Sequence, residues 1–355
     1  MSGIQVIDTV DAASLAPFDS IIDVRSPAEF AEDHVPGAVN LPVLDDDQRA
    51  TVGTIYVQES RFKARRIGAA IIARNIAGHL ETALADKPGA WRPLVYCWRG
   101  GQRSGAMATI LSQVGWRTAV VAGGYKTYRR HVKSRLYDED RPLRLVLLDG
   151  STGSGKTEML GRLAEMGLQV LDLEGLAEHR GSLLGALPGR PQPSQKMFES
   201  RLLQALDALD PARPVVAEAE SSKVGERMVP PALWKAMVGA PRIELVVPAE
   251  ARARYLVRAY GDIARDRAAL DDALQRLPTH PGRKRLENWR SLADAGAFEE
   301  LALGLIESHY DPAYARSSRK DQRPSLGAVE LRDLDPDTQV LAAKAVARMV
   351  RSAAP

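Results

Sequence analysis

Residues 145–157 read Leu-Val-Leu-Leu-Asp-Gly-Ser-Thr-Gly-Ser-Gly-Lys-Thr. The apolar run predicts a buried strand, and the pattern G-x4-G-K-[ST] follows it without a gap and opens a predicted helix over 157–166. Glycines in such a loop direct backbone N–H groups at a phosphate, while Lys156 can contact terminal phosphates and Thr157 can ligate Mg²⁺. The stretch therefore predicts an α/β domain with a phosphate-binding loop. The loop residues are Gly150, Ser151, Thr152, Gly153, Ser154, Gly155, Lys156 and Thr157.

Further apolar runs predict a parallel sheet covered by helices around this loop. The expected strands are 169–173, 215–219 and 243–247, and the expected helices cover most of 249–306 and 338–351. Carboxylates lie at or just beyond the ends of two of these strands, where they could bind a metal or orient water beside a phosphate, or could simply be solvated strand ends. They are Asp172, Glu174, Glu218 and Glu220.

The first part of the chain shows the same alternation of strands and helices. Strands are expected at 21–24, 94–96 and 119–121, with helical patterns around 61–84 and 104–114, which again predicts a parallel sheet with flanking helices. A short polar stretch closed by Pro142 reads as a linker. The sequence therefore predicts a first domain over 1–136, a linker over 137–142 and a second domain over 143–355 with a helical C-terminal part.

The single cysteine lies in a second strand–loop–helix segment. Residues 94–104 read Leu-Val-Tyr-Cys-Trp-Arg-Gly-Gly-Gln-Arg-Ser. Backbone N–H groups and a helix N-terminus around the sulfur, together with two arginines, would lower the thiol pKa and hold an anion. The alternative is a buried, inert cysteine. The candidate catalytic residues are Cys97, Arg99, Gly100, Gly101, Arg103 and Ser104.

Charge is distributed unevenly along the chain. The net charge is only +3, yet residues 92–135 hold nine Lys or Arg and no Asp or Glu. Residues 61–74 add five basic residues, again without an acid. A solvated surface can look like this, but the pattern favours a surface that meets a polyanion, either nucleic acid or a small phosphorylated ligand.

Composition narrows the class of protein. No apolar run approaches the roughly 18 residues of a membrane span, and the N-terminus has no secretory pattern. One cysteine allows no intrachain disulfide. We therefore expect a cytoplasmic protein without a membrane or disulfide partner.

The first domain resembles the rhodanese (sulfurtransferase) family. The resemblance rests on residues 23–30, Asp-Val-Arg-Ser-Pro-Ala-Glu-Phe, on 34–42, His-Val-Pro-Gly-Ala-Val-Asn-Leu-Pro, and on 121–124, Val-Ala-Gly-Gly. It implies a loop cysteine that carries a persulfide. Cys97 to Arg103 is a Cys-x5-Arg loop, one residue longer than the usual rhodanese loop and similar to that of rhodanese-fold phosphatases and arsenate reductases. Such a loop suits a tetrahedral, phosphate-sized anion.

The two domains together resemble the tRNA 2-selenouridine synthase family. The matching strings are residues 96–104, 123–129, 148–157 and 172–182. The resemblance implies a bacterial enzyme that S-geranylates the wobble 2-thiouridine of tRNA from geranyl diphosphate, and then replaces the geranylthio group by selenium from selenophosphate.

This resemblance suggests a role for each loop. Lys156 would stabilise the departing diphosphate, and the cysteine loop would take selenophosphate, with Cys97 either carrying selenium or only positioning its donor. Basic side chains would hold the tRNA backbone, so binding should weaken with salt, and two aromatic rings could stack on the uridine or simply pack. These tRNA-binding candidates are Lys126, Arg129, Arg130, Trp98 and Tyr125.

Three other functions stay open from the sequence. One is a Cys-x5-Arg enzyme of the phosphatase or arsenate reductase type. The second is a nucleotide-dependent kinase with a rhodanese module, and the third is an RNA-binding adaptor with an inactive rhodanese domain. The phosphate loop could bind a nucleotide, a prenyl diphosphate or a tRNA phosphate, and Mg²⁺ is a possible cofactor.

Overall fold

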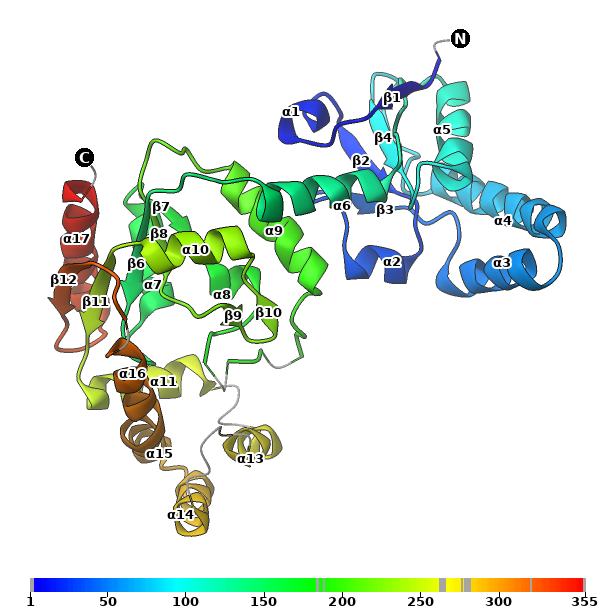
Figure 1. Cartoon of the computed structure of the whole chain (residues 1–355). Coiled ribbons are helices and arrows are strands. Elements are labelled where there is room, and N and C mark those ends of the chain that lie inside the picture. Colours follow the sequence, from blue (N-terminus) through cyan, green and yellow to red (C-terminus); the bar gives the residue numbers. More distant parts are fainter. Residues whose placement is uncertain are drawn as a thin grey trace. The chain divides into compact units, whose positions relative to one another are not determined.

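The computed structural model describes residues 3–182, 185–187, 189–261, 266–275, 277, 282–319 and 321–353. The chain forms two compact units. The first comprises Met1–Glu139 and Ser194–Asp207, and the second Asp140–Pro193 and Ala208–Pro355. Each unit is built on its own five-stranded parallel sheet (Figure 1), which confirms the predicted two-domain α/β class.

The first sheet has the strand order β1-β5-β4-β2-β3. Its strands are β1 (Gln5–Ile7), β2 (Ser20–Asp23), β3 (Val39–Asn40), β4 (Pro93–Tyr96) and β5 (Ala119–Val121). The three strands expected from apolar runs are β2, β4 and β5, and β4 is buried at every position. The two edge strands β1 and β3 are short and largely exposed, so no apolar run announces them.

Helices of the first unit flank this sheet. They are α1 (Ala12–Leu15), α2 (Pro27–Glu32), α3 (Asp46–Gln58), α4 (Arg61–Glu81), α5 (Gln102–Val114), α6 (Tyr125–Lys133) and the π-helical turn η1 (Ser134–Asp138). Helix α6 continues directly into η1, which extends two residues into the expected linker at 137–142.

Helix α9 (Gln195–Asp207) belongs to the first unit, although the sequence placed its residues in the second domain. Phe198 and Leu202 are fully buried in it. Its Glu199 pairs with Arg129 of α6 and accepts a hydrogen bond of 2.7 Å from the Tyr137 hydroxyl. Local sequence pattern identifies such a helix but does not indicate which sheet it covers.

The second sheet has the order β12-β11-β6-β8-β7. Its strands are β6 (Leu145–Asp149), β7 (Gln169–Leu171), β8 (Val215–Glu218), β11 (Arg242–Val246) and β12 (Ser325–Glu330). Strand β6 is buried at every position, as its Val/Leu run predicts for a central strand. A short antiparallel hairpin is formed by β9 (Lys223–Val224) and β10 (Arg227–Met228).

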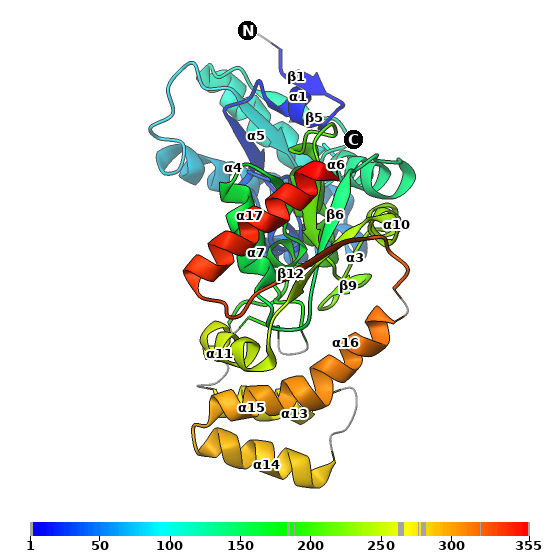
Figure 2. The same ribbon diagram turned by 90° about the vertical axis from the view of Figure 1, so that its left-hand side faces the viewer.

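Helices of the second unit fall into two groups. Those packed on or beside the sheet are α7 (Lys156–Glu165), α8 (Leu173–Leu176), α10 (Pro231–Gly239) and α17 (Pro336–Ser352), with α17 against α7 and β12 (Figure 2). The others gather beyond one end of the sheet: α11 (Ala249–Ala259), α13 (Arg267–Gln275), α14 (Arg283–Asp294), α15 (Phe298–Leu305), η2 (Ile306–Tyr310) and α16 (Asp311–Ser318). This second group has an apolar core of its own, built around Trp289, Leu301 and Leu305.

Within the described part of the chain, no helix combines the length and the apolar character that crossing a membrane requires.

Candidate functional site

The cysteine loop connects the end of β4 to the start of α5. Cys97 follows the strand directly and is buried. Its Sγ accepts hydrogen bonds from the Gly101 N–H at 3.3 Å and from the Ser104 hydroxyl at 3.2 Å. Burial alone would raise the pKa of the Cys97 thiol, but these donors and the backbone N–H groups of Ser104 and Arg99 outweigh it and hold that pKa below its ordinary value. The loop therefore favours the thiolate more than an ordinary cysteine environment does, through Ser104 and backbone N–H groups and not through arginine side chains.

Two glycines allow the next loop to support the cysteine loop at very close range. Gly124 has φ +59°, and a Cβ placed on it would lie 2.1 Å from the Cys97 carbonyl oxygen. Gly100 has φ +64°, and its Cβ would meet the Val121 carbonyl oxygen at 2.7 Å. No other residue fits at either position without moving the backbone. The N-terminus of α6 then fixes the loop, because the Tyr125 N–H donates to the Cys97 carbonyl at 2.8 Å.

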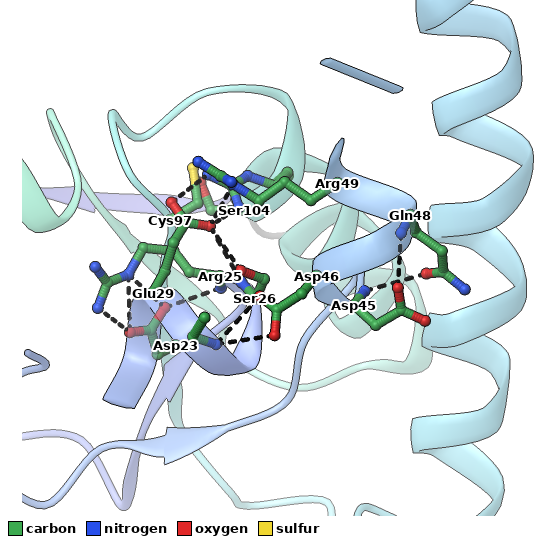
Figure 3. Close-up of polar contacts among 12 residues, drawn as sticks. Asp23, Arg25, Ser26, Glu29, Asp45, Asp46, Gln48, Arg49, Cys97 and Ser104 are labelled. Atoms are coloured by element: carbon green, nitrogen blue, oxygen red, sulfur yellow. Dashed lines mark hydrogen bonds and ion pairs between the residues drawn. The ribbon is translucent and has the colours of Figure 1, made fainter. Parts of the chain in front are cut away.

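Glu29, labelled in Figure 3 with Arg49 and Cys97, pairs with two arginines beside the cysteine loop. Its carboxylate accepts Arg103 at 2.7 Å and Arg49 of α3 at 3.0 Å. Burial would raise the pKa of Glu29, but the hydrogen bond and charge of Arg103 lower it overall. Sequence reasoning missed Glu29 and Arg49. The Ser26-x-x-Glu29 capping box that starts α2 was a readable local signal, but the approach of Arg49 is purely tertiary.

A buried ion pair lies at the end of β2, which pairs with β4, the strand that leads into the cysteine loop. Arg25 is 1% exposed and forms a salt bridge of 2.6 Å with Asp23. Its guanidinium also lies 4.0 Å from the centre of the Tyr125 ring. Neither residue reaches solvent, so the pair supports the loop structurally.

The candidate tRNA contacts have different environments. Lys126 and Arg130 are exposed, whereas Arg129 is engaged by Glu199. Tyr125 is 3% exposed and donates its hydroxyl to Asp33 at 2.7 Å. Trp98 stacks on Tyr125, with ring centres 5.3 Å apart, and keeps part of its surface accessible. A stacking role would therefore fall to Trp98.

The phosphate loop follows β6 and opens α7, as predicted. Gly150, Gly153 and Gly155 all have positive φ. The Lys156 ammonium donates to the Gly150 carbonyl at 2.9 Å and thus lies over the loop. The Ser154 hydroxyl is buried and has no hydrogen-bond partner among the described residues.

An arginine from α11 supports the outer side of this loop. Arg252 donates to the Thr152 carbonyl at 3.2 Å and forms two hydrogen bonds, of 2.8 and 2.7 Å, with Asp311. Arg252 thereby links the phosphate loop to Asp311 of α16, which belongs to the group of helices beyond the sheet.

Two of the four candidate carboxylates have structural roles, and the other two face a pocket. Asp172 caps α8, accepting the Gly175 N–H at 2.6 Å. Glu218 is fully buried and accepts the Leu173 N–H at 3.0 Å; burial raises the pKa of its carboxyl well above the ordinary value. Glu174 and Glu220 line the pocket that contains the phosphate loop. The structure thus places only two of the four beside the loop.

Glu174 and Glu220 converge on one point of the pocket wall. A Cβ placed on Gly181 would lie 2.2 Å from Glu174 Oε1 and 2.7 Å from Glu220 Oε1. Glu174 also accepts the Thr157 hydroxyl at 2.9 Å. Burial and the neighbouring charge of Glu220 raise the pKa of Glu174 to about 8, so the metal-free protein favours a protonated Glu174 at neutral pH.

The raised pKa of Glu174 predicts a stability that falls as pH rises. The pKa of Glu174 is raised in the folded protein, so its contribution is fully present below the unfolded value of 4.5 and is lost as pH passes about 8. Glu174→Gln keeps a neutral group there, so its melting temperature should fall less than that of the wild type between pH 6 and 9. The difference should reach at least about 2–4 °C, the effect of about 1 kcal/mol in a domain of this size.

The measurement is a thermal melt across this pH range with a chelator present. Glu165, an exposed residue at the end of α7, provides a control, since Glu165→Gln should follow the wild-type curve. Parallel curves for wild type and Glu174→Gln would show that Glu174 is ionised throughout this pH range.

A separate apolar pocket adjoins the phosphate-loop pocket. Both are lined by Thr152, Ser182, Leu256 and Tyr260. The remaining lining of the apolar pocket is Val257, Leu270, Phe298, Leu301, Ala302, Leu305 and Tyr310. Sequence reasoning did not find this pocket, because its lining extends from Thr152 to Tyr310 and comes from two loops and several separate helices.

The described residues contain no group of three or more His, Cys, Asp or Glu side chains that could hold a metal ion. Thr157, Glu174 and Glu220 offer oxygen donors in the pocket that contains the phosphate loop. Mg²⁺ commonly binds through one or two carboxylates and completes its coordination with substrate phosphates and water, so this donor set fits a Mg²⁺ that arrives with a phosphorylated substrate.

Comparison with known proteins gives matches along most of the chain. A family model described as the tRNA 2-selenouridine synthase AAA domain matches residues 143–280, and the rhodanese-like domain model matches 6–131. The tRNA 2-selenouridine synthase of Aeromonas salmonicida is 34% identical, with 83% of this chain and 86% of that protein covered. Those of Hahella chejuensis and Salmonella schwarzengrund are each 32% identical, covering 84% and 86% of this chain and 86% and 92% of theirs.

Proposed function

The chain belongs to the tRNA 2-selenouridine synthase family, and we propose that it converts 2-thiouridine at the wobble position of tRNA into 2-selenouridine in two steps. The first step transfers a geranyl group from geranyl diphosphate to sulfur, and the second replaces the geranylthio group by selenium from selenophosphate. The single observation that carries this proposal is the pair of intact anion-binding loops on a chain that matches the family over most of its length.

The first step is assigned to the phosphate loop. The 2-thio sulfur attacks C1 of the geranyl group, an S–C bond forms, and the C–O bond to diphosphate breaks with its electron pair leaving on oxygen. The N3 proton of the thiouridine is released, so the product is neutral. Lys156 and the loop N–H groups would stabilise the charge that develops on the departing diphosphate. A Mg²⁺ held by Thr157 and Glu174 would supply further positive charge to it.

The second step is assigned to the cysteine loop. Selenium of selenophosphate adds to C2 of the uridine, and the geranyl thiolate leaves and takes up a proton. Water then cleaves the Se–P bond, giving 2-selenouridine and phosphate. S-alkylation is chemically useful here because a 2-thiocarbonyl is a poor leaving group. The lowered thiol pKa of Cys97 and the donors of Gly101 and Ser104 support a role for this loop in holding or carrying the selenium donor.

The tRNA is assigned to the basic surface of the first unit. Residues 92–135 carry nine Lys or Arg and no acid, and Lys126 and Arg130 are exposed within that run. Such a surface supplies the sequence-independent part of RNA binding through phosphate contacts.

The proposal predicts two separable products on one tRNA. Incubation with 2-thiouridine-containing tRNA and geranyl diphosphate should yield S-geranyl-2-thiouridine, and subsequent selenophosphate should yield 2-selenouridine. Nucleosides are identified by mass spectrometry after each addition. A tRNA without the 2-thio group is the control and should stay unmodified. If thiolated tRNA is unchanged after both additions, the substrate assignment is wrong.

A further inference from the structure

The apolar pocket lies directly against the phosphate loop. A Cβ placed on Gly153 of that loop would meet Leu256 Cγ at 2.9 Å, and Leu256 lines both the apolar pocket and the phosphate-loop pocket. A ligand whose phosphates occupy the loop can therefore extend into the apolar pocket without leaving the protein.

The lining of this pocket suits a hydrocarbon better than a nucleoside. Its described lining carries only four hydroxyls as side-chain polar groups, and two of them, those of Ser182 and Tyr260, share a hydrogen bond of 2.9 Å. A base and a ribose would need several directed partners, and polar groups buried without partners weaken binding. The side chains of Phe298, Leu301 and Leu305 offer none. A hydrocarbon needs only apolar surface.

We infer that this pocket receives the hydrocarbon chain of the diphosphate substrate and sets the chain length that the enzyme accepts. The inference rests on the proposed function and deepens it, because it identifies the phosphate loop as a site for an allylic lipid diphosphate and not for a nucleotide. Helix α15 forms the part of the pocket wall that limits the length of the hydrocarbon chain. Its lining residues are Phe298, Leu301, Ala302 and Leu305.

The geometry also fixes the direction in which the hydrocarbon chain of the substrate lies. Thr152, Ser182, Leu256 and Tyr260 form the entrance shared with the phosphate loop, whereas the α15 residues and Leu270 line the apolar pocket alone. The diphosphate end therefore remains at Lys156, and the distal carbons approach α15. A larger side chain on α15 should shorten the accepted chain, and a smaller one should lengthen it.

The test compares kcat/KM for dimethylallyl, geranyl and farnesyl diphosphates with thiolated tRNA as acceptor. Ala302→Phe should lower the geranyl to dimethylallyl ratio by at least about 10-fold, since even one methylene in an apolar pocket is worth roughly 10–200-fold. Inorganic pyrophosphate should still inhibit Ala302→Phe with its wild-type constant, because the loop is unchanged. Ala164→Phe, an exposed α7 position outside the pocket, is the matched control and should keep the wild-type ratio.

A second variant makes the result independent of how well Ala302→Phe folds. Phe298→Ala should raise the farnesyl to geranyl ratio by about 10-fold or more. Unchanged ratios in the folded variants would overturn the pocket assignment, as would competitive displacement of geranyl diphosphate by ATP at equal concentration. Failure of the wild type to geranylate any thiolated tRNA is a different result, because it would overturn the proposed function itself.

Discussion

Cys97→Ser is expected to accumulate S-geranyl-2-thiouridine and to lose 2-selenouridine by at least about 10³-fold, the order of effect seen when one member of a catalytic unit is removed. The sulfur is surrounded by donors that favour its anion, the Gly101 N–H at 3.3 Å and the Ser104 hydroxyl at 3.2 Å. A serine hydroxyl at the same place stays un-ionised at neutral pH, so it cannot replace the thiolate in holding the selenium donor. The measurement is nucleoside mass spectrometry with rates taken separately for each step.

Ser104→Ala tests the surroundings of the Cys97 sulfur without removing the sulfur itself. It removes one donor from the sulfur and leaves the loop backbone in place, so the thiol pKa should rise and the selenation rate should reach its maximum at higher pH than in the wild type. Geranylation should be unaffected in both variants. Wild-type selenation by Cys97→Ser would show that the sulfur takes no part and that the loop acts only through its backbone and arginines.

Local sequence predicted the strand that precedes and the helix that follows each of the two loops. The β6 strand, the phosphate loop and α7 follow one another without interruption, and each has its own local signal: a Val/Leu run, a glycine spacing and a helical period. Strand β4, the cysteine loop and α5 have the same property. Close backbone packing at Gly100 and Gly124 explains why those glycines occur.

What the sequence did not reveal depends on tertiary contact or on weak local signal. Strand β12 is a largely exposed edge strand with Gly327 in its middle, so it lacks an apolar run. Helix α9 has a clear amphipathic pattern, but only its tertiary contacts, with α6 and η1 among them, assign it to the first unit. Arg49 reaches Glu29 from a different helix, and the apolar pocket is assembled from helices distant in sequence.

The same distinction applies to the candidate carboxylates. Position after a strand made all four equally plausible, but the fold gives them different partners. Asp172 is used as a helix cap and Glu218 is enclosed by the core, whereas Glu174 and Glu220 face the phosphate loop. Chemical role therefore follows from the direction of each side chain, which the strand-end pattern does not encode.

Lys156→Ala is expected to lower geranylation by about 10²–10³-fold, the cost of removing one preorganised group that stabilises a developing negative charge. The ammonium lies over the phosphate loop, 2.9 Å from the Gly150 carbonyl, where it would meet the leaving diphosphate. The same variant should selenate tRNA that already carries S-geranyl-2-thiouridine at the wild-type rate. Initial rates for each step, started from the appropriate tRNA, make this measurement.

Two controls separate charge loss from structural damage. Lys344→Ala removes an exposed lysine of α17 and should leave both steps unchanged. Lys156→Arg keeps the charge and should recover part of the geranylation rate, although the guanidinium has a different shape. The division of labour between the loops would be wrong if Lys156→Ala geranylated normally and lost only selenation, because the phosphate loop would then serve the selenium donor. Loss of both steps in a folded Lys156→Ala protein would likewise contradict it, since the cysteine loop should work without the diphosphate site once the geranyl group is in place.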